Sequence, residues 1–428
     1  MKKFLNGIGF VLVCMGFAAT VQAQVSPDGN WEYEVDAGDT ITITEYLGNG
    51  GNVTVPVKLP KDPTAPISIL CPVTAIGNFA FSDCSSLTRV TIPFSVTHIE
   101  TNPFSRCTAL IAISVDESNV SYSNQDGVLF NKAFTELIAY PAGKEGTDYS
   151  IPGNVGTIKG SAFSGCSRLT RVTIPTSVTC IKSSAFSYCS RLTNVTIPTS
   201  VTWLGSFAFF SCSRLTSVTI PDSVALIDSQ TFMNCISLTR VTIPDSVMSI
   251  GSYAFRGCSG LTSVTIPEGV TSIGSWNPFA GCSSLSVISV EASNTAYSSE
   301  DGVLFDKAFT RLIAYPPARA GTGYSIPGSV TSIEGAAFED CISLTRVTIP
   351  GSVTSIAVWA FDGCSSLTRA LFLGDAPGEF GSNVFDDCAD NFTVFHRPGK
   401  TGFETICSTY PCALMTTQAG IDVLLLTE

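Results

Sequence analysis

Hydrophobic residues return in the same order about every 23 residues along most of this chain. One unit, residues 238–260, carries apolar side chains at Leu238, Val241, Ile243, Val247, Ile250, Phe255 and Cys258. The alternation of Val241 and Ile243 predicts a strand with one buried face, and the proline that follows ends it. A second extended piece is predicted around Val247, and the spacing of Phe255 and Cys258 predicts one short helical turn. Each unit is therefore expected to form a strand, a corner, a second strand and a tight turn.

A regularly placed cysteine marks the repeat. It occurs at Cys84, Cys107, Cys166, Cys189, Cys212, Cys235, Cys258, Cys282, Cys341, Cys364 and Cys388. Successive members are 23 or 24 residues apart, except for two steps of 59. A unit this short cannot bury its hydrophobic face alone, whereas stacked units share that face with both neighbours. We therefore predict a β-rich (α/β) solenoid over residues 71–369, with parallel strands stacked on one face.

Two longer blocks, residues 116–152 and 291–327, interrupt the period and match each other. The first contains DGVLFNKAFTELIAYP, and the second contains DGVLFDKAFTRLIAYP 175 residues further on. Their agreement indicates that a segment of several repeats was duplicated. Each block adds two apolar runs that predict strands joined by short polar turns. A hairpin or widened coil within the stack is the preferred interpretation, and a protruding arm is the alternative.

The ends of the chain depart from the repeat. Residues 1–23 begin with two lysines, continue with an apolar run and finish with small residues, which predicts a signal peptide cleaved after Ala23. Residues 24–70 contain the alternating stretches WEYEV and TITITEY, so we predict a β-rich N-terminal cap. Residues 370–428 are predicted to form a C-terminal cap and tail. No later apolar run reaches the roughly 20 residues that a membrane-spanning helix needs.

The chain is acidic, with a formal net charge of −12. Removal of the predicted signal peptide takes away two lysines and no acid, which leaves −14. The sequence contains no basic block, so nucleic acid and anionic lipid are poor candidates for a partner.

The repeated cysteines are interpreted as buried free thiols that pack in register. Stacked coils lie about 5 Å apart, within the Cα range of a disulfide, so pairing between coils is the alternative. Cys407 and Cys412, in the stretch CSTYPC, are the best candidates for a disulfide because they are close in sequence.

Candidates for chemistry are few. The two histidines, His98 and His396, have no cysteine or carboxylate cluster near them in the sequence and are interpreted as surface residues. Asp222, Asp245 and Glu268 share one repeat position, which predicts an exposed acidic row, with a weak calcium site as the alternative. No catalytic residue, metal ligand or cofactor is predicted.

The outward positions of the predicted strands hold the candidate ligand-binding residues. They are the arginines Arg89, Arg171, Arg240, Arg346 and Arg369, and, two residues further on in their units, threonines that include Thr173, Thr196, Thr219 and Thr242. Parallel stacking would turn them into columns on one sheet face. One interpretation is a solvated face whose threonines favour β structure. The other is a protein-binding face, because arginine is enriched at interfaces and a cationic column attracts acidic partners.

The repeat pattern L-T-x-V-x-I-P-x-S-V-T-x-I-x-x-x-A-F-x-x-C resembles that of BspA-type leucine-rich-repeat proteins, which are bacterial surface or secreted proteins. The resemblance covers about residues 73–388 and implies a right-handed superhelix of 23-residue coils. It also implies protein binding and adhesion without catalysis, to host matrix, mucin or other cells, because the family has no shared catalytic residues.

The predicted partner is therefore an extracellular protein or glycoprotein, and the predicted location is the cell surface or the medium. One alternative is a structural spacer or surface-layer element. Another is an accessory binding domain of an extracellular system that degrades glycans or peptides. The sequence makes no prediction of the oligomeric state.

Overall fold

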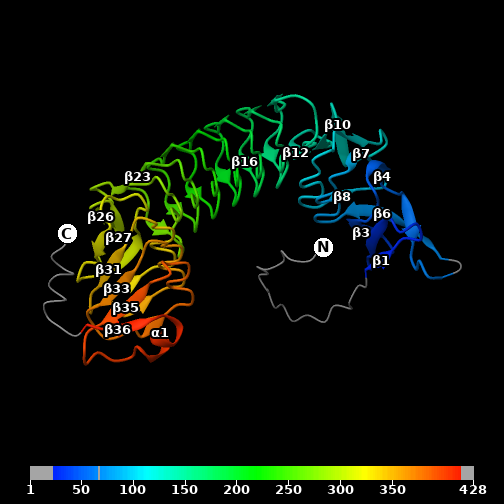
Figure 1. The fold of residues 1–428 in the computed structure, drawn as a ribbon. Coiled ribbons are helices and arrows are strands. Elements are labelled where there is room, and N and C mark those ends of the chain that lie inside the picture. The colour runs from blue at the N-terminus through cyan, green and yellow to red at the C-terminus, as the bar shows by residue number, and fades with distance from the viewer. Residues whose placement is uncertain (1–22, 66–67, 416–428) are drawn as a thin grey trace.

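The computed structural model describes residues 23–65 and 68–415. In this part the chain winds into a solenoid that bends into an arch, with an N-terminal cap at one end and a C-terminal cap at the other (Figure 1). Residues 1–22 of the predicted signal peptide and residues 416–428 of the predicted C-terminal tail lie outside the described residues. Among the described residues, no helix has the length and hydrophobicity that crossing a bilayer requires.

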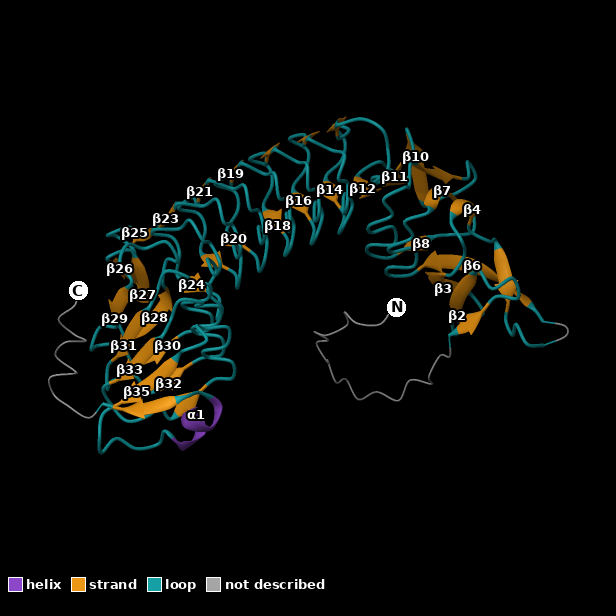
Figure 2. Ribbon diagram, viewed as in Figure 1, coloured by secondary structure: helices purple, strands orange, loops and turns teal. Residues whose placement is uncertain are grey.

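Each coil contributes a short strand to a parallel ladder on the outer edge of the arch, here called the outer ladder (Figure 2). Its strands are β4 (Gly51–Thr54), β7 (Leu87–Ile92), β9 (Ala112–Val115), β13 (Asp148–Ser150), β15 (Arg171–Thr173), β17 (Asn194–Thr196), β19 (Ser217–Thr219), β21 (Arg240–Thr242), β23 (Ser263–Ile266), β25 (Val287–Val290), β29 (Gly323–Ser325), β31 (Arg346–Ile349), β33 (Arg369–Phe372), β35 (Thr393–His396) and β36 (Cys412–Leu414). Val195, Val218 and Val241 are consecutive Cα partners and face the core, as the alternating pattern predicts.

The second extended piece of each coil forms a parallel lateral ladder beside the first (Figure 2). Its strands are β3 (Ile41–Tyr46), β6 (Leu70–Ile76), β8 (His98–Ile99), β14 (Thr157–Ile158), β16 (Cys180–Ile181), β18 (Trp203–Leu204), β20 (Leu226–Ile227), β22 (Ser249–Ile250), β24 (Ser272–Ile273), β30 (Ser332–Ile333), β32 (Ser355–Ile356) and β34 (Glu379–Phe380). The third side of each coil is a turn, and these turns follow the inner side of the arch.

The turns differ from the prediction of a short helical turn. In the coil that ends at Cys258, Ala254 N donates to Gly251 O, and Cys258 N donates to Phe255 O (3.1 Å). These are β-turn bonds, and Tyr253 (φ 57°) and Gly257 (φ 70°) lie in the left-handed region that an α-helix excludes. The spacing of two buried residues three apart fits a series of β-turns as well as a helix. The one helix of the described residues is α1 (Glu404–Thr409), in the C-terminal cap.

Phenylalanine rings stack through the core behind these turns. In six consecutive coils the rings are Phe163, Phe186, Phe209, Phe232, Phe255 and Phe279, with centroids 4.8–5.7 Å apart and planes within 10° of parallel. The four inner rings of this series are each buried between two others, so the repeated Phe serves two coil interfaces.

The repeated cysteines hydrogen-bond from coil to coil rather than pairing. Cys189 Sγ donates to Phe163 O (3.1 Å), and Cys212 Sγ donates to Phe186 O (3.1 Å), with the same contact in later coils. Both thiols are fully buried. A cysteine fits this position because it is small, tolerates burial and still donates to a backbone carbonyl of the preceding coil.

We expect these thiols to resist alkylation in the native protein. Burial raises the pKa of Cys189 and of Cys235 to about 12, so the reactive thiolate is scarce at pH 8. Iodoacetamide labelling followed by peptide mass spectrometry should modify them only after unfolding. Cys180, which is half-buried and off the ladder, should react first. Rapid native labelling of Cys189 or Cys235 would contradict this packing.

The two longer blocks lie within the stack. The first forms β10 (Tyr122–Gln125), β11 (Val128–Asn131) and β12 (Glu136–Ala139), and the second forms β26 (Tyr297–Glu300), β27 (Val303–Asp306) and β28 (Arg311–Ala314). In each block the three strands are antiparallel, and the last strand joins the lateral ladder in parallel. Phe130 and Phe305 are fully buried, so both blocks continue the core.

The blocks bend the solenoid because they widen it on one side only. The outer ladder is interrupted, since β9 does not pair with β13 and β25 does not pair with β29. The turns on the inner side still stack directly, with Ser105 Oγ 3.1 Å from Ser164 Oγ and Asn277 N donating to Gly335 O. Additional strands outside and none inside produce the two bends of the arch (Figure 1).

A buried ion pair crosses the second bend. Arg256 Nε donates to Glu339 Oε1 (2.9 Å), from a coil 83 residues earlier in the chain. Glu339 is 4% exposed, whereas Arg256 is 35% exposed and also lies over the Tyr253 ring. Burial raises the pKa of Glu339, and the nearby guanidinium opposes that rise.

Both ends of the stack are covered. At the N-terminus β1 (Gln24–Val25), β2 (Trp31–Val35) and β3 form an antiparallel sheet, and β5 (Lys58–Pro60) pairs with β6. Tyr33 and Ile43 are fully buried against the first coil. At the C-terminus α1 and β36 close the stack, and Cys407 and Cys412 are joined by a disulfide. Buried apolar side chains thus separate both ends of the core from solvent.

Candidate binding surface

The outer ladder presents a row of polar side chains over its middle coils. Exposed residues alternate with buried valines in β15, β17, β19 and β21. Cα register aligns Arg171, Asn194, Ser217 and Arg240 in one column, and Thr173, Thr196, Thr219 and Thr242 form the next column. The predicted threonine column is therefore continuous over four coils.

The five predicted arginines do not form one column. Arg89 lies beside Ala112 near the N-terminal end, and Arg346 and Arg369 are direct Cα partners near the C-terminal end. Arg171 and Arg240 are three coils apart, with Asn194 and Ser217 between them. The two inserted blocks separate these three groups, because they interrupt the outer ladder.

A hollow of about 390 Å³ lies at the end of the middle column. It is lined by side chains that include Arg240, Thr242, Ser263, Thr265 and Glu291. The hollow forms where β21 and β23 are neighbours without ladder hydrogen bonds, so the two strands leave space between them. Two of the predicted ligand-binding residues, Arg240 and Thr242, thus line a concave site that also contains a carboxylate.

A second arginine row was missed by the sequence analysis. Arg168, Arg191 and Arg214 follow the cysteine by two residues in three consecutive coils, and all three are exposed. The stretch CSRL, which occurs 23 residues apart at residues 166, 189 and 212, is the sequence feature that identifies them. They lie at the corner where each turn leads into the outer ladder.

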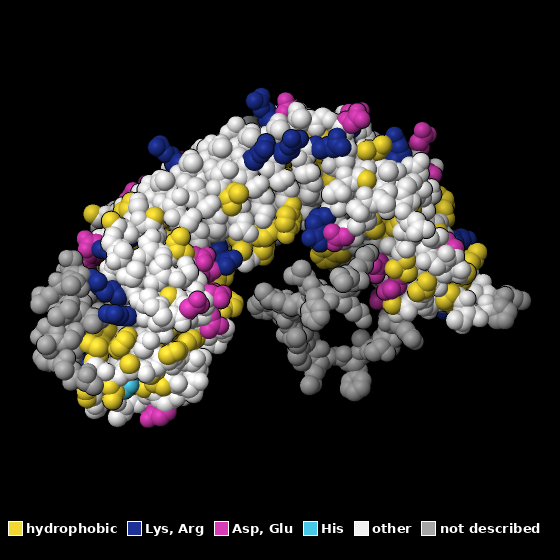
Figure 3. All heavy atoms as spheres, viewed as in Figure 1, with side chains coloured by type: hydrophobic (Ala, Val, Ile, Leu, Met, Phe, Trp, Pro, Cys, Tyr) yellow, Lys and Arg dark blue, Asp and Glu magenta, His cyan; other side chains and the backbone are white. Residues whose placement is uncertain are grey.

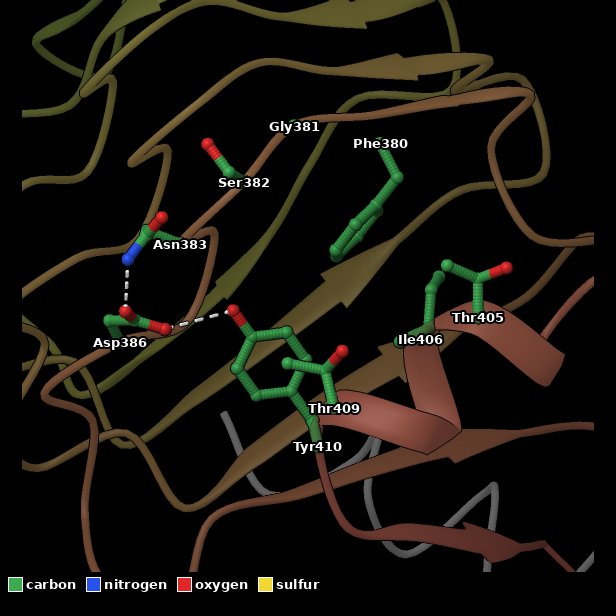
Figure 4. Close-up of a pocket in the computed structure, with 9 residues that line it drawn as sticks. All are labelled: Phe380, Gly381, Ser382, Asn383, Asp386, Thr405, Ile406, Thr409 and Tyr410. Carbon is green, nitrogen blue, oxygen red and sulfur yellow. Dashed lines mark hydrogen bonds between the residues drawn. The ribbon is translucent and has the colours of Figure 1, made fainter.

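A polar hollow of about 440 Å³ lies in the C-terminal cap (Figure 4). Figure 4 shows Phe380 and Tyr410 on opposite sides of it, with α1 along one edge. Tyr410 OH donates to Asp386 (3.0 Å), and the Asn383 amide donates to the same carboxylate. Burial raises the pKa of Tyr410 to about 12, so its hydroxyl remains a donor at neutral pH.

The other chemical candidates are dispersed. His98 is exposed in β8, and His396 stacks on Phe403 with centroids 4.2 Å apart. Asp222, Asp245 and Glu268 are exposed at one corner of three coils. Within residues 23–65 and 68–415, no group of three or more His, Cys, Asp or Glu side chains is arranged to hold a metal ion. The burial of Asp362 among other acids on the inner side raises its pKa to about 6.

Comparisons with known proteins identify the repeat. A family model described as a BspA-type leucine-rich-repeat region, in six copies, matches residues 64–136, 142–239, 225–301 and 321–407. A leucine-rich cell surface protein from Faecalibacterium prausnitzii is 27% identical, with 94% of this chain and 97% of that chain covered, at a TM-score of 0.47. A leucine-rich-repeat protein from Bacteroides ovatus is 20% identical, with 94% and 100% covered, at a TM-score of 0.37. A comparison with curated protein sequences gave no match.

Proposed function

Because this chain belongs to the BspA-type leucine-rich-repeat family, we propose that it is an exported, non-catalytic protein that binds an extracellular protein or glycoprotein. The features of residues 1–23 support export, since they have the order of a signal peptide. The observation that carries the binding role is the exposed, hydrogen-bonded outer ladder, on which polar side chains repeat at strand spacing.

Such a surface suits adhesion for physical reasons. Repetition along a rigid ladder offers many weak contacts at once, and weak contacts that act together give useful avidity. The hollow beside Arg240 and Thr242 adds a concave point on this otherwise flat face. Mucins, matrix proteins and the surfaces of other cells present repeated epitopes that match this arrangement, so adhesion is the role we favour.

Replacing the five predicted strand arginines should weaken ligand binding. The variant carries Arg89→Ser, Arg171→Ser, Arg240→Ser, Arg346→Ser and Arg369→Ser. Exposed ion pairs contribute about 0.2–1 kcal/mol each, so we expect Kd to rise about tenfold or more, with a flatter dependence on salt. Surface plasmon resonance against matrix proteins and mucins identifies the ligand and measures the change.

The control variant carries Asp222→Ser, Asp245→Ser and Glu268→Ser. These substitutions alter an exposed acidic row at a different corner of the coils. This control should leave Kd unchanged or strengthen the binding of an acidic ligand. Unchanged binding in the arginine variant, with circular dichroism showing an intact fold, would eliminate the outer ladder as the binding face.

A further inference from the structure

Positive charge is concentrated in the middle of this acidic protein. Residues 149–221 contain six basic residues, Lys159, Arg168, Arg171, Lys182, Arg191 and Arg214, and no Asp or Glu. Since this segment carries +6 and the whole chain carries −12, the remainder carries −18. These cations form no contiguous basic block in the sequence, because they are spread over 73 residues. Coiling brings the separate positions together, and Figure 3 shows Lys and Arg side chains in a row near β12 and β16.

Three of these arginines are stacked coil on coil. Arg191 and Arg214 lie between two sets of coil-to-coil hydrogen bonds, Ser213 Oγ to Ser190 O (3.2 Å) and Thr216 N to Thr193 O (3.1 Å). Thr193 N donates to Thr170 O in the same way, which places Arg168 on the preceding coil. Hydrogen-bonded coils are spaced like strands, so the row has one positive charge about every 4.8 Å.

The charges in this row are available to a ligand. The ion pairs among the described residues involve Lys61, Arg106, Arg256, Arg311, Arg319 and Lys400, all outside residues 149–221. In the described part of the chain no carboxylate pairs with Arg168, Arg191 or Arg214, and all three are exposed. An anion that binds there does not have to displace an internal partner.

The hydroxyl groups beside the row indicate the chemistry of the partner. Thr193 Oγ1 donates to Thr170 O, and Thr216 Oγ1 donates to Thr193 O, so these exposed or half-buried hydroxyls have used their protons. Their lone pairs can accept hydrogen bonds from a ligand rich in hydroxyl donors. The strips 166–172, 189–195 and 212–218 contain no aromatic residue, so the row lacks the stacking platform that single-stranded nucleic acid requires.

We propose that Arg168, Arg191 and Arg214 bind a linear acidic polysaccharide. Its sulfate or carboxylate groups would contact the guanidinium row, and its sugar hydroxyls would donate to the threonines beside the row. A sugar unit is about as long as one coil is thick, so a polysaccharide chain can follow the stacking direction in register. This inference goes beyond the proposed function, because it assigns a glycan class to a surface distinct from the five predicted strand arginines.

The test compares two triple variants of the whole chain that change the charge equally. The first variant removes the row and carries Arg168→Ser, Arg191→Ser and Arg214→Ser. Serine already occupies this repeat position in five other coils, at Ser86, Ser237, Ser284, Ser343 and Ser366. The matched control carries Lys58→Ser, Lys61→Ser and Arg311→Ser, three exposed cations outside residues 149–221 and outside the proposed protein-binding face. The probes are chondroitin sulfate and hyaluronan, with dextran, poly-L-glutamate and single-stranded DNA as comparison ligands.

We expect the row variant to lose affinity for chondroitin sulfate by about 30- to 100-fold in calorimetry or biolayer interferometry, with a shallower salt dependence. The control variant should lose less than about threefold, and an Arg→Lys version of the row should keep most of the binding. Stronger binding of chondroitin sulfate than of hyaluronan would assign sulfate as the preferred group, and the reverse would assign carboxylate.

Equal losses in the two triple variants would overturn the proposal, because they would show a response to overall charge alone. So would binding of poly-L-glutamate or DNA as tight as that of the polysaccharide, or no polysaccharide binding by the wild type at about 0.15 M salt. None of these results would affect binding of a protein ligand through the five predicted strand arginines. The two proposals therefore fail separately.

Discussion

Phe209→Ala is expected to lower the free energy of unfolding by about 3–5 kcal/mol, the range for truncation of a buried phenylalanine. Phe209 is 0% exposed and lies between Phe186 and Phe232, with centroids 5.2 and 5.5 Å away. The neighbouring coils cannot close the cavity, because Phe186 N donates to Ala208 O and Phe209 N donates to Thr231 O. Equilibrium unfolding in urea measures the difference.

Phe210→Ala is the matched control for this prediction. Phe210 is the next residue along the same turn, is half-buried and touches Tyr188 edge-on at 5.1 Å. Its truncation removes less buried apolar area, so the expected loss is about 1 kcal/mol. Equal losses at the two positions, or a loss at Phe209 below about 1 kcal/mol, would show that the ring stack does not hold the coils together.

Arg256→Met is expected to destabilise the protein by about 2–3 kcal/mol at pH 7.5. The substitution leaves the carboxylate of Glu339 buried without its partner, and Glu339 Oε2 already has no hydrogen-bond partner among the described residues. The value is below the usual range for a buried pair because Arg256 is 35% exposed and solvent screens the interaction. Thermal and urea unfolding measure the loss.

The pH dependence of this variant follows from the direction of the Glu339 shift. The pKa of Glu339 is raised in the folded protein, so the unfavourable charge exists only above that pKa. Loss of Arg256 raises this pKa further. The variant should therefore recover stability relative to the wild type as the pH falls from 7.5 towards 5, because Glu339 becomes neutral.

Two comparisons test whether the buried charge of Glu339 causes the loss of stability in Arg256→Met. The double variant Arg256→Met with Glu339→Leu should be more stable than Arg256→Met alone, because it removes the unpaired carboxylate. Arg311→Ala breaks an exposed pair with Glu334 and should cost less than about 1 kcal/mol. A double variant no more stable than the single one would contradict the assignment of the loss to Glu339.

The strand positions could be predicted from the sequence because burial of one strand face leaves a period of two. The alternation of Val241 and Ile243 predicted a strand, and β21 contains Val241 at its buried centre. The turn conformation could not be predicted in the same way. Tyr253 adopts a left-handed backbone although it is not glycine, and its hydrophobic neighbours are spaced as in a helix.

The candidate surface was predicted in part. The threonine column of Thr173 to Thr242 lies as expected, because one register joins those coils. The arginine column is divided, because at each block the outer strands on either side, β9 and β13 or β25 and β29, do not pair. The Arg168 row has a constant spacing in the sequence, but its residues precede the strands, so strand alternation does not predict that they stack.

The amino-acid sequence by itself determined the repeating structural unit of this protein, the coil. A 23-residue order of apolar side chains has one favourable arrangement, the stacked coil, because only stacking buries every unit's face and satisfies its backbone. The tertiary structure alone decided which distant residues meet. The bends produced by β10–β12 and β26–β28 bring Arg256 to Glu339 and divide the arginine column, because such contacts depend on how whole coils are tilted and not on the local pattern within any one of them.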